Sequence, residues 1–312
     1  MWIRPLLWLA LGLLVGRLWM TDPGRWSGRA VRAGQSLEAN VPYKSDLRIS
    51  ILAAEEPGST NPSASIGLRK AILAVHGGDW IGGSSADYVL QLGRLAEHGY
   101  VLFAADYSLA RPGQPSWPAA IDDLRESVRW IRRNAVRYRV DPDRIAIVGS
   151  GAGGHLALIL GHELAADAGN AMKVQAVVSL YGPTDLEGLI LDRQHGHEAV
   201  RTFLGGGHST ALETARAASP IRQVDRSSPP TLLIHGLDDA WVGPEHSITY
   251  ARALRDAGVF HRLLLIPAAR HGFELQLGPP SSEDLLPAVL DFLSVSWQTG
   301  LPKSTDLPTL SD

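Results

Sequence analysis

The sequence predicts an α/β fold in which a mostly parallel central sheet carries helices on both faces and a small cap. Short apolar runs alternate with longer segments of helical periodicity along the chain. Several of these runs, such as residues 145–148 and 263–266, are continuously apolar. Continuous apolar runs are typical of strands covered on both faces, and strand–helix alternation indicates one open sheet.

The predicted strands follow one another between residues 47 and 266. They cover residues 47–53, 71–75, 101–105, 145–148, 174–180, 231–234 and 262–266. The predicted helices cover residues 88–97, 118–138, 152–165, 245–257 and 283–296. The second of these helices has apolar residues at helical spacing, with arginines and acids opposite. Residues 183–229 break the alternation, and we interpret them as a cap or loop inserted over the sheet.

The first 33 residues predict an export signal or a short membrane anchor, followed by a linker. Residues 5–16 carry no charge, and twelve residues are typical of a signal-peptide core, whereas a membrane span needs about twenty. Arginines after the run favour a cytoplasmic domain by the positive-inside rule, and a signal sequence predicts the opposite side. We expect membrane association through residues 1–20, one domain over residues 34–298 and a tail over residues 299–312.

The composition excludes several classes of function. Lysine and arginine total 29 and aspartate and glutamate 32, giving a net charge of −3, whereas a nucleic-acid binder normally has a basic face. Cysteine is absent, which excludes disulfides, thiolate metal sites and a cysteine nucleophile. His195 and His197 lack a third metal ligand nearby. We therefore expect no nucleic acid, no cofactor and no metal, and a small molecule as the partner.

A glycine-rich motif follows the predicted strand at residues 71–75. It reads HGGDW over residues 76–80. Gly77 and Gly78 have no Cβ, so the backbone can bring N–H groups into a cleft. Such groups can stabilise a developing oxyanion, and we therefore predict an oxyanion-binding loop here.

Two further motifs supply an acid and a base. Asp239 follows the predicted strand at residues 231–234, where a carboxylate can orient a histidine and stabilise its imidazolium form. Asp238 is the competing candidate beside it. His271 follows the last predicted strand and is the candidate general base. The order of glycine-rich loop, strand–helix turn, Asp and His is that of an α/β-hydrolase.

The chain resembles the acetyl-esterase, hormone-sensitive-lipase and kynurenine-formamidase branch of the α/β-hydrolase superfamily. The resemblance spans about residues 45–295. It rests on residues 76–80, 106–110, 116–119, 141–145, 149–157, 180–185, 218–221, 229–236 and 271–273. It implies an α/β-hydrolase fold and relatives that cleave esters of small acyl groups or related amides. It also implies His271 as base, Asp239 as its partner, and Gly77, Gly78 and Ala152 as oxyanion donors.

The nucleophile position of that family holds a glycine in this chain. The family motif is G-x-S-x-G, and residues 149–157 read GSGAGGHLA, so Gly151 stands where the serine is expected. Ser150 is out of register, because Gly149 and Gly153 provide the small flanking residues for position 151 only. Glycine has no hydroxyl, so we predict no covalent catalysis. We expect either a pseudoenzyme that binds an ester-like ligand or a partner, or a weak hydrolase in which His271 activates water directly.

A second interpretation of the same residues is a dinucleotide site. Gly149, Gly151 and Gly154 form G-x-G-x-x-G between a predicted strand and a predicted helix. That fingerprint needs an acid after the next strand, and Asp167 precedes it instead. The alternative also gives no role to Asp239 or His271, so we rank it second.

Overall fold

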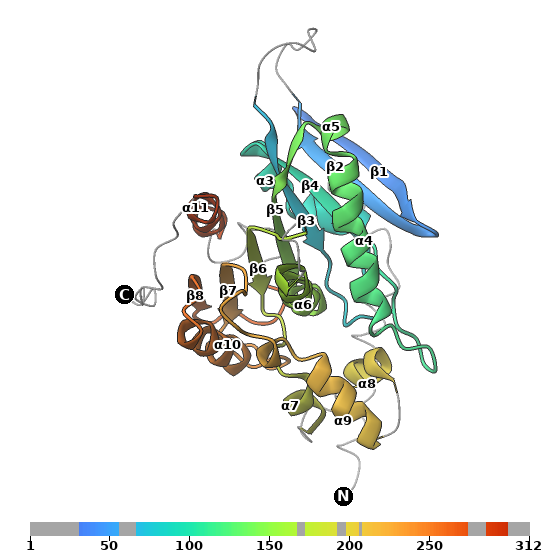
Figure 1. Cartoon of the computed structure of the whole chain (residues 1–312), viewed down its shortest axis with the longest axis vertical. Coiled ribbons are helices and arrows are strands. Elements are labelled where there is room, and N and C mark those ends of the chain that lie inside the picture. Colours follow the sequence, from blue (N-terminus) through green and yellow to red (C-terminus); the bar gives the residue numbers. More distant parts are fainter. Residues whose placement is uncertain are drawn as a thin grey trace, which may run out of the picture.

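The computed structural model describes residues 31–55, 67–166, 172–191, 198–205, 208–273 and 285–298. Within them lies a sheet of eight strands in the order β1-β2-β4-β3-β5-β6-β7-β8 (Figure 1). The strands are β1 (Gln35–Lys44), β2 (Leu47–Ala54), β3 (Arg69–Val75), β4 (Tyr100–Ala105), β5 (Val140–Ser150), β6 (Ala176–Leu180), β7 (Thr231–Gly236) and β8 (His261–Ile266). Strand β2 is antiparallel to both neighbours, and the other pairs are parallel. The predicted mostly parallel sheet is confirmed.

Helices pack on both faces of this sheet. The helices are α2 (Ser85–Gln91), α3 (Gly93–Glu97), α4 (Ala119–Arg133), α5 (Ala135–Tyr138), α6 (Ala152–Ala166), α7 (Leu186–Leu191), α8 (Glu198–Leu204), α9 (His208–Ala217), η1 (Pro220–Arg222), α10 (Glu245–Asp256) and α11 (Leu286–Ser296). One core joins the sheet to α4, α6 and α10, and the other joins it to α2, α3 and α11.

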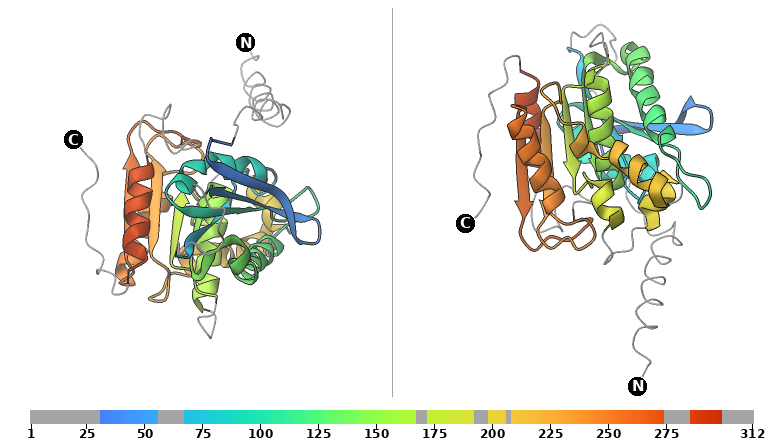
Figure 2. Two further views of the ribbon diagram at one scale, coloured as in Figure 1. Left: turned by 90° about the horizontal axis from the view of Figure 1, so that it is seen from above. Right: turned by 60° about the horizontal axis from the view of Figure 1, so that its bottom comes forward.

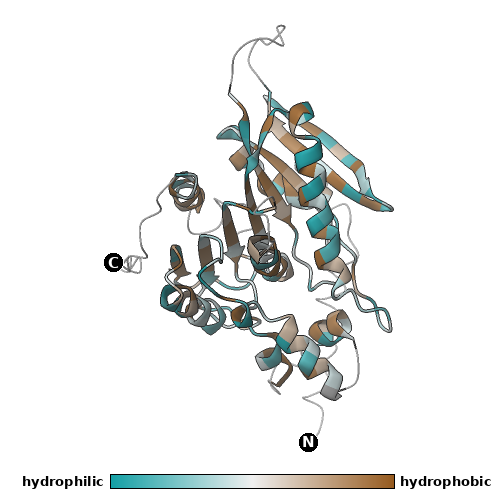
Figure 3. Cartoon of the chain, in the orientation of Figure 1, coloured by the Kyte–Doolittle hydropathy of each residue, from teal (hydrophilic) through white to brown (hydrophobic). Residues whose placement is uncertain are grey.

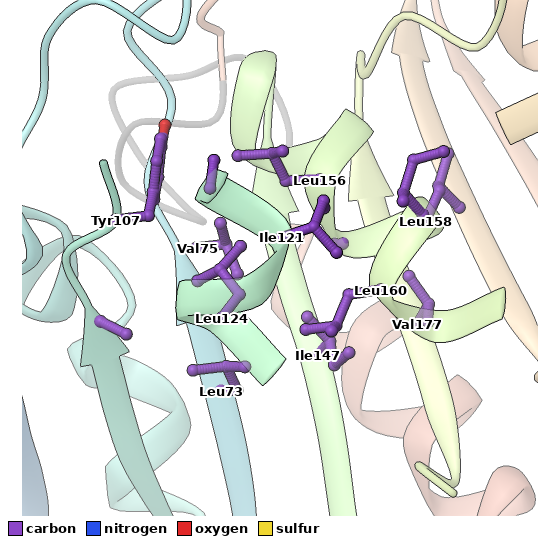
Figure 4. Packing of buried hydrophobic residues seen from close by; sticks show 14 of the residues in the cluster. Leu73, Val75, Tyr107, Ile121, Leu124, Ile147, Leu156, Leu158, Leu160 and Val177 are labelled. Carbon is purple, nitrogen blue, oxygen red and sulfur yellow. The ribbon is translucent and has the colours of Figure 1, made fainter. Parts of the chain in front are cut away.

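Alternate side chains of each strand enter different cores. In β3, Leu73 belongs to the first core and Ile72 to the second, because successive residues of a strand point to opposite faces. Figure 3 shows the inner strands as nearly continuous hydrophobic bands, as expected for strands covered on both sides. Figure 4 shows side chains of the first core from β3, α4 and α6: Leu73, Val75, Ile121, Leu124, Leu156 and Leu160.

The sequence-based prediction differs from the structure at several elements. It missed β1, an edge strand whose mixed burial gives no apolar run. The predicted helix at residues 118–138 is two helices, α4 and α5. The backbone N–H and side-chain amide of Asn134 both bond to the carbonyl of Trp130 at the junction. The predicted helix at residues 88–97 is likewise divided, at Leu92.

The segment between β6 and β7 contains α7, α8, α9 and η1. Figures 1 and 2 show the three α-helices gathered at the end of the sheet where β6 ends. The predicted signal or anchor in residues 1–20, and residues 299–312, lie outside the described residues. None of the helices in the described part of the chain is long and apolar enough to cross a membrane.

Two histidines on α6 are buried in this fold, and they make its stability depend on pH. Burial lowers the pKa of His155 and of His162 to about 4. Between about pH 6.5, the ordinary histidine value, and about pH 4, the unfolded chain therefore binds more protons than the folded one. We expect the free energy of unfolding to fall as the pH drops through this window, by up to about 1.4 kcal/mol per pH unit for each histidine.

Urea unfolding at several pH values measures this slope. His162→Gln should flatten the slope, because it removes one of the two buried titrating groups. His98→Gln, at an exposed position, is the matched control and should leave it as in the wild type. Equal slopes in the wild type and His162→Gln would contradict the prediction.

Candidate active site

The turn between β5 and α6 is built from glycines that touch other backbone. A Cβ built on Gly149 would lie 2.2 Å from the carbonyl oxygen of Gly153, and one on Gly153 would lie 2.1 Å from that of Val75. These distances are far below any real contact, so both positions require glycine. The close approach brings the first turn of α6 against the end of β3.

Gly151 occupies the apex of this turn. Its φ of +52° lies in the left-handed region, where another residue type costs about 1–3 kcal/mol. Its N–H donates to the carbonyl of Leu180 at 2.9 Å, and its carbonyl accepts from the N–H of His155 at 3.0 Å. These two bonds fix the apex between the end of β6 and the first turn of α6.

Asp239 and His271 form a hydrogen-bonded pair beside the turn. The Nδ1 of His271 donates to Oδ2 of Asp239 at 2.7 Å, which leaves Nε2 as the other ring nitrogen. The second carboxylate oxygen accepts from the N–H groups of Trp241 and Val242 at 2.9 and 3.0 Å. The side chain of Asp239 is fully buried, whereas Asp238 is exposed, so the structure selects Asp239 of the two acids.

A second histidine supports the same carboxylate. Buried His235 has its Nε2 2.8 Å from the carbonyl of Val242 and 3.4 Å from Oδ2 of Asp239. Its Nδ1 accepts from the hydroxyl of Ser247 at 2.7 Å. Burial by itself raises the pKa of Asp239, but the hydrogen bonds from His235 and His271 outweigh it and hold that pKa well below its usual range. Asp239 is therefore an anion at neutral pH.

The imidazole of His271 faces the apex glycine. A Cβ built on Gly151 would lie 3.5 Å from Nε2 of His271 and 3.5 Å from the ring of Tyr181, both ordinary contacts. The rings of Tyr181 and His271 have their centroids 4.4 Å apart. Tyr181 and His235 lie within the ranges 180–185 and 229–236 that carry the resemblance, and the sequence analysis predicted no role for either at this site. The signal for His235 was its position four residues before the acid.

The glycine-rich loop lies next to the same turn. A Cβ built on Gly77 would lie 2.9 Å from the carbonyl oxygen and 3.5 Å from the hydroxyl of Ser150. Ser150 is thus directed toward the loop, and position 151 is the one directed toward His271. Gly78 has a φ of +112°, and a Cβ there would lie 2.5 Å from the carbonyl oxygen of Gly82. Ala152 begins α6, so its N–H has no acceptor within that helix.

The structure therefore brings together Gly151, Asp239 and His271, which the sequence singled out for this site, and leaves the competing Asp238 exposed. Asp239 is hydrogen-bonded to His271, His271 faces position 151, and the loop of Gly77 and Gly78 lies beside that position. Over the part of the chain that is described, no group of three histidine, aspartate or glutamate side chains could hold a metal ion. The His195 and His197 pair lies outside that part.

Comparison with known proteins identifies the family to which this chain belongs. The family model BD-FAE matches residues 60–254, more than half of the chain. The chain belongs to the BD-FAE family. This BD-FAE chain is similar to curated esterases: esterase LipC of Mycobacterium tuberculosis is 33% identical over 65% of this chain, and esterase LipQ of the same organism is 32% identical over 75% of it. These matches cover 53% of LipC and 57% of LipQ, so this BD-FAE chain spans just over half of each relative.

Solved structures agree on the fold. Esterase B from Lactobacillus rhamnosis superposes with a TM-score of 0.72 at 19% identity, over 91% of this chain and 97% of that one. This BD-FAE chain is thus an α/β-hydrolase of the esterase branch, as the resemblance implied, and its relatives are carboxylic ester hydrolases. The dinucleotide alternative finds no support among these matches.

Proposed function

We propose that this BD-FAE protein binds small carboxylic esters and hydrolyses them slowly, without an acyl-enzyme intermediate. The observation that carries the proposal is the pairing of an ionised Asp239 with His271, whose Nε2 faces a glycine where an esterase of this branch has its serine. In this proposal Asp239 supports His271 as the base, the loop of Gly77 and Gly78 binds the oxyanion, and no side-chain hydroxyl is available at position 151. Small esters are neutral, which suits a site whose carboxylate is already paired with His271.

The proposed reaction uses water as the nucleophile. Nε2 of His271 accepts a proton from a water molecule while the oxygen of that water attacks the ester carbonyl carbon. The N–H groups of Gly77, Gly78 and Ala152 stabilise the oxyanion that forms. The intermediate then releases the alkoxide, which takes the proton back from the imidazolium. Acid and alcohol are the products, and Asp239 stabilises the imidazolium throughout.

The expected rate is low. In serine hydrolases, loss of the nucleophile costs about 10⁶-fold, and the oxyanion hole and binding retain about 10³-fold over water. A second candidate, favoured by the glycine at the apex, is a pseudoenzyme that binds an ester-like ligand without turning it over.

His271→Ala separates the two candidates. We expect the purified wild-type protein to release nitrophenol from p-nitrophenyl acetate faster than buffer alone does. In His271→Ala the rate of release should fall to that of buffer, because no base remains. His98→Ala, at an exposed position, is the control and should match the wild type. Turnover that survives in His271→Ala would contradict the proposed base, and ligand binding with no wild-type turnover would establish the pseudoenzyme.

A further inference from the structure

A buried histidine connects the glycine-rich loop to the helical segment between β6 and β7. The indole Nε1 of Trp80 donates to Nδ1 of His155 at 3.2 Å. The Nε2 of His155 in turn donates to the carbonyl of Ala218, one residue after α9, at 2.7 Å. Only the tautomer with its proton on Nε2 satisfies both bonds. Because burial lowers the pKa of His155 to about 4, the ring is neutral at neutral pH and keeps this tautomer.

A side chain of α8 packs against one face of the indole. The ring of Phe203 stacks on Trp80 with centroids 4.9 Å apart and planes 14° apart, and it meets His155 edge-on. The carbonyl of Phe203 accepts from the N–H groups of Ser116 and Trp117, both at 3.1 Å. All of these rings except Trp117 are buried. The indole is thus fixed from two sides by residues outside the loop.

The loop needs such support because its backbone is strained. Asp79 and Trp80 have φ values of 55° and 59°, in the left-handed region that non-glycine residues avoid. Each such residue costs about 1–3 kcal/mol and persists only where its surroundings fix it. These two residues directly follow Gly77 and Gly78. The directions of the glycine N–H groups therefore depend on what holds Trp80.

We propose that His155 is a positioning residue for the oxyanion loop: by accepting the indole N–H of Trp80 it fixes the N–H groups of Gly77 and Gly78. In this arrangement the carbonyl of Ala218 keeps Nδ1 of His155 as an acceptor, so the end of α9 takes part in the geometry of the loop. The inference rests on the proposed function, because it takes the loop to be the oxyanion-binding one.

Two substitutions at one position test the proposal. In His155→Asn the side-chain oxygen lies close to the place of Nδ1 and can still accept from Trp80. In His155→Gln the amide nitrogen lies close to the place of Nε2, so the bond to Ala218 is kept and the bond from Trp80 is lost. Each variant loses one buried hydrogen bond, so a role in stability alone would affect both alike. Trp80→Phe keeps a stacked ring without an N–H and should behave as His155→Gln does.

The readout is the amide resonances of Gly77 and Gly78 in ¹H–¹⁵N spectra of the full chain. We expect both resonances to shift in His155→Gln and Trp80→Phe and to stay near their wild-type positions in His155→Asn. In the Gly151→Ser background, His155→Gln should lower kcat for a short ester about tenfold with KM unchanged, about 1.4 kcal/mol of transition-state stabilisation, and His155→Asn should not.

Equal shifts in His155→Asn and His155→Gln, or no shift in either, would overturn the proposal. So would a rise in KM without a fall in kcat. If Gly151→Ser gives no turnover at all, a serine at position 151 does not complete the proposed site, and the glycine resonances still decide whether His155 positions the loop. If a His155 variant does not fold, Trp80→Phe supplies the same comparison against the wild type.

Discussion

Gly151→Ser is expected to raise hydrolysis of short-chain esters by about 10³-fold or more. The substitution adds the hydroxyl at the position from which a built Cβ lies 3.5 Å from Nε2 of His271, so the base can accept its proton. The nearest atoms to that Cβ are at ordinary contact distance, so the side chain fits. The left-handed φ costs the variant about 1–3 kcal/mol of stability, which is the strain that glycine relieves.

Two measurements test this result. The first is the steady-state turnover of a short-chain ester, and the second is mass spectrometry of the protein after treatment with a phosphonate ester. The phosphonate should add covalently at position 151 in the variant and nowhere in the wild type. Gly151→Ala, which adds the Cβ without the hydroxyl, is the control and should show no gain. Ser150→Ala should leave the gained activity in place, because Ser150 is directed toward Gly77. An active wild type that is labelled at Ser150 would show that the nucleophile position had been misassigned.

Gly153→Ala is expected to destabilise the fold by about 3–5 kcal/mol. A Cβ at this position would lie 2.1 Å from the carbonyl oxygen of Val75 and 2.5 Å from that of His76, and backbone cannot move aside as a flexible side chain can. The change forces α6 away from the end of β3. Chemical denaturation should show a lower midpoint than in the wild type.

Gly82→Ala is the matched control for this effect. Gly82 lies in the loop that follows β3, and the nearest atom to a Cβ built there, the carbonyl oxygen of Gly78, is 3.8 Å away. We expect its midpoint to stay within error of the wild type. If Gly153→Ala were as stable as Gly82→Ala, the close backbone contact between α6 and β3 would not be required for the stability of the fold, and the prediction would be wrong.

The fold and the main site residues could be predicted from the sequence because they depend on local patterns. Continuous apolar runs located strands β3 to β8, and the order of motifs located Gly151, Asp239 and His271. The edge strand β1 could not be found in this way, because its residues are only partly buried. The helices α7, α8 and α9 are short and fell in a segment interpreted as a cap or loop.

The contacts that hold the site together could not be predicted, because they join residues far apart in the chain. Tyr181 meets His271 across 90 positions, and Trp80 meets His155 across 75. Whether Asp238 or Asp239 serves the histidine depends on which carboxylate is turned inward by the N–H groups of Trp241 and Val242. Each of these facts follows from packing rather than from a motif.

The same N–H groups have a consequence for how such a site can persist. Asp239 ties its own loop together through Trp241 and Val242, and it occupies a fully buried position that another side chain would disturb. Loss of this carboxylate would leave the two N–H groups without their acceptor and therefore cost stability, whether or not any ester is cleaved. A side chain at the apex would meet only ordinary contacts, and it would cost about 1–3 kcal/mol because of the left-handed φ. A substitution at position 151 would therefore change the proposed chemistry while leaving Asp239, His271 and the glycine-rich loop in place.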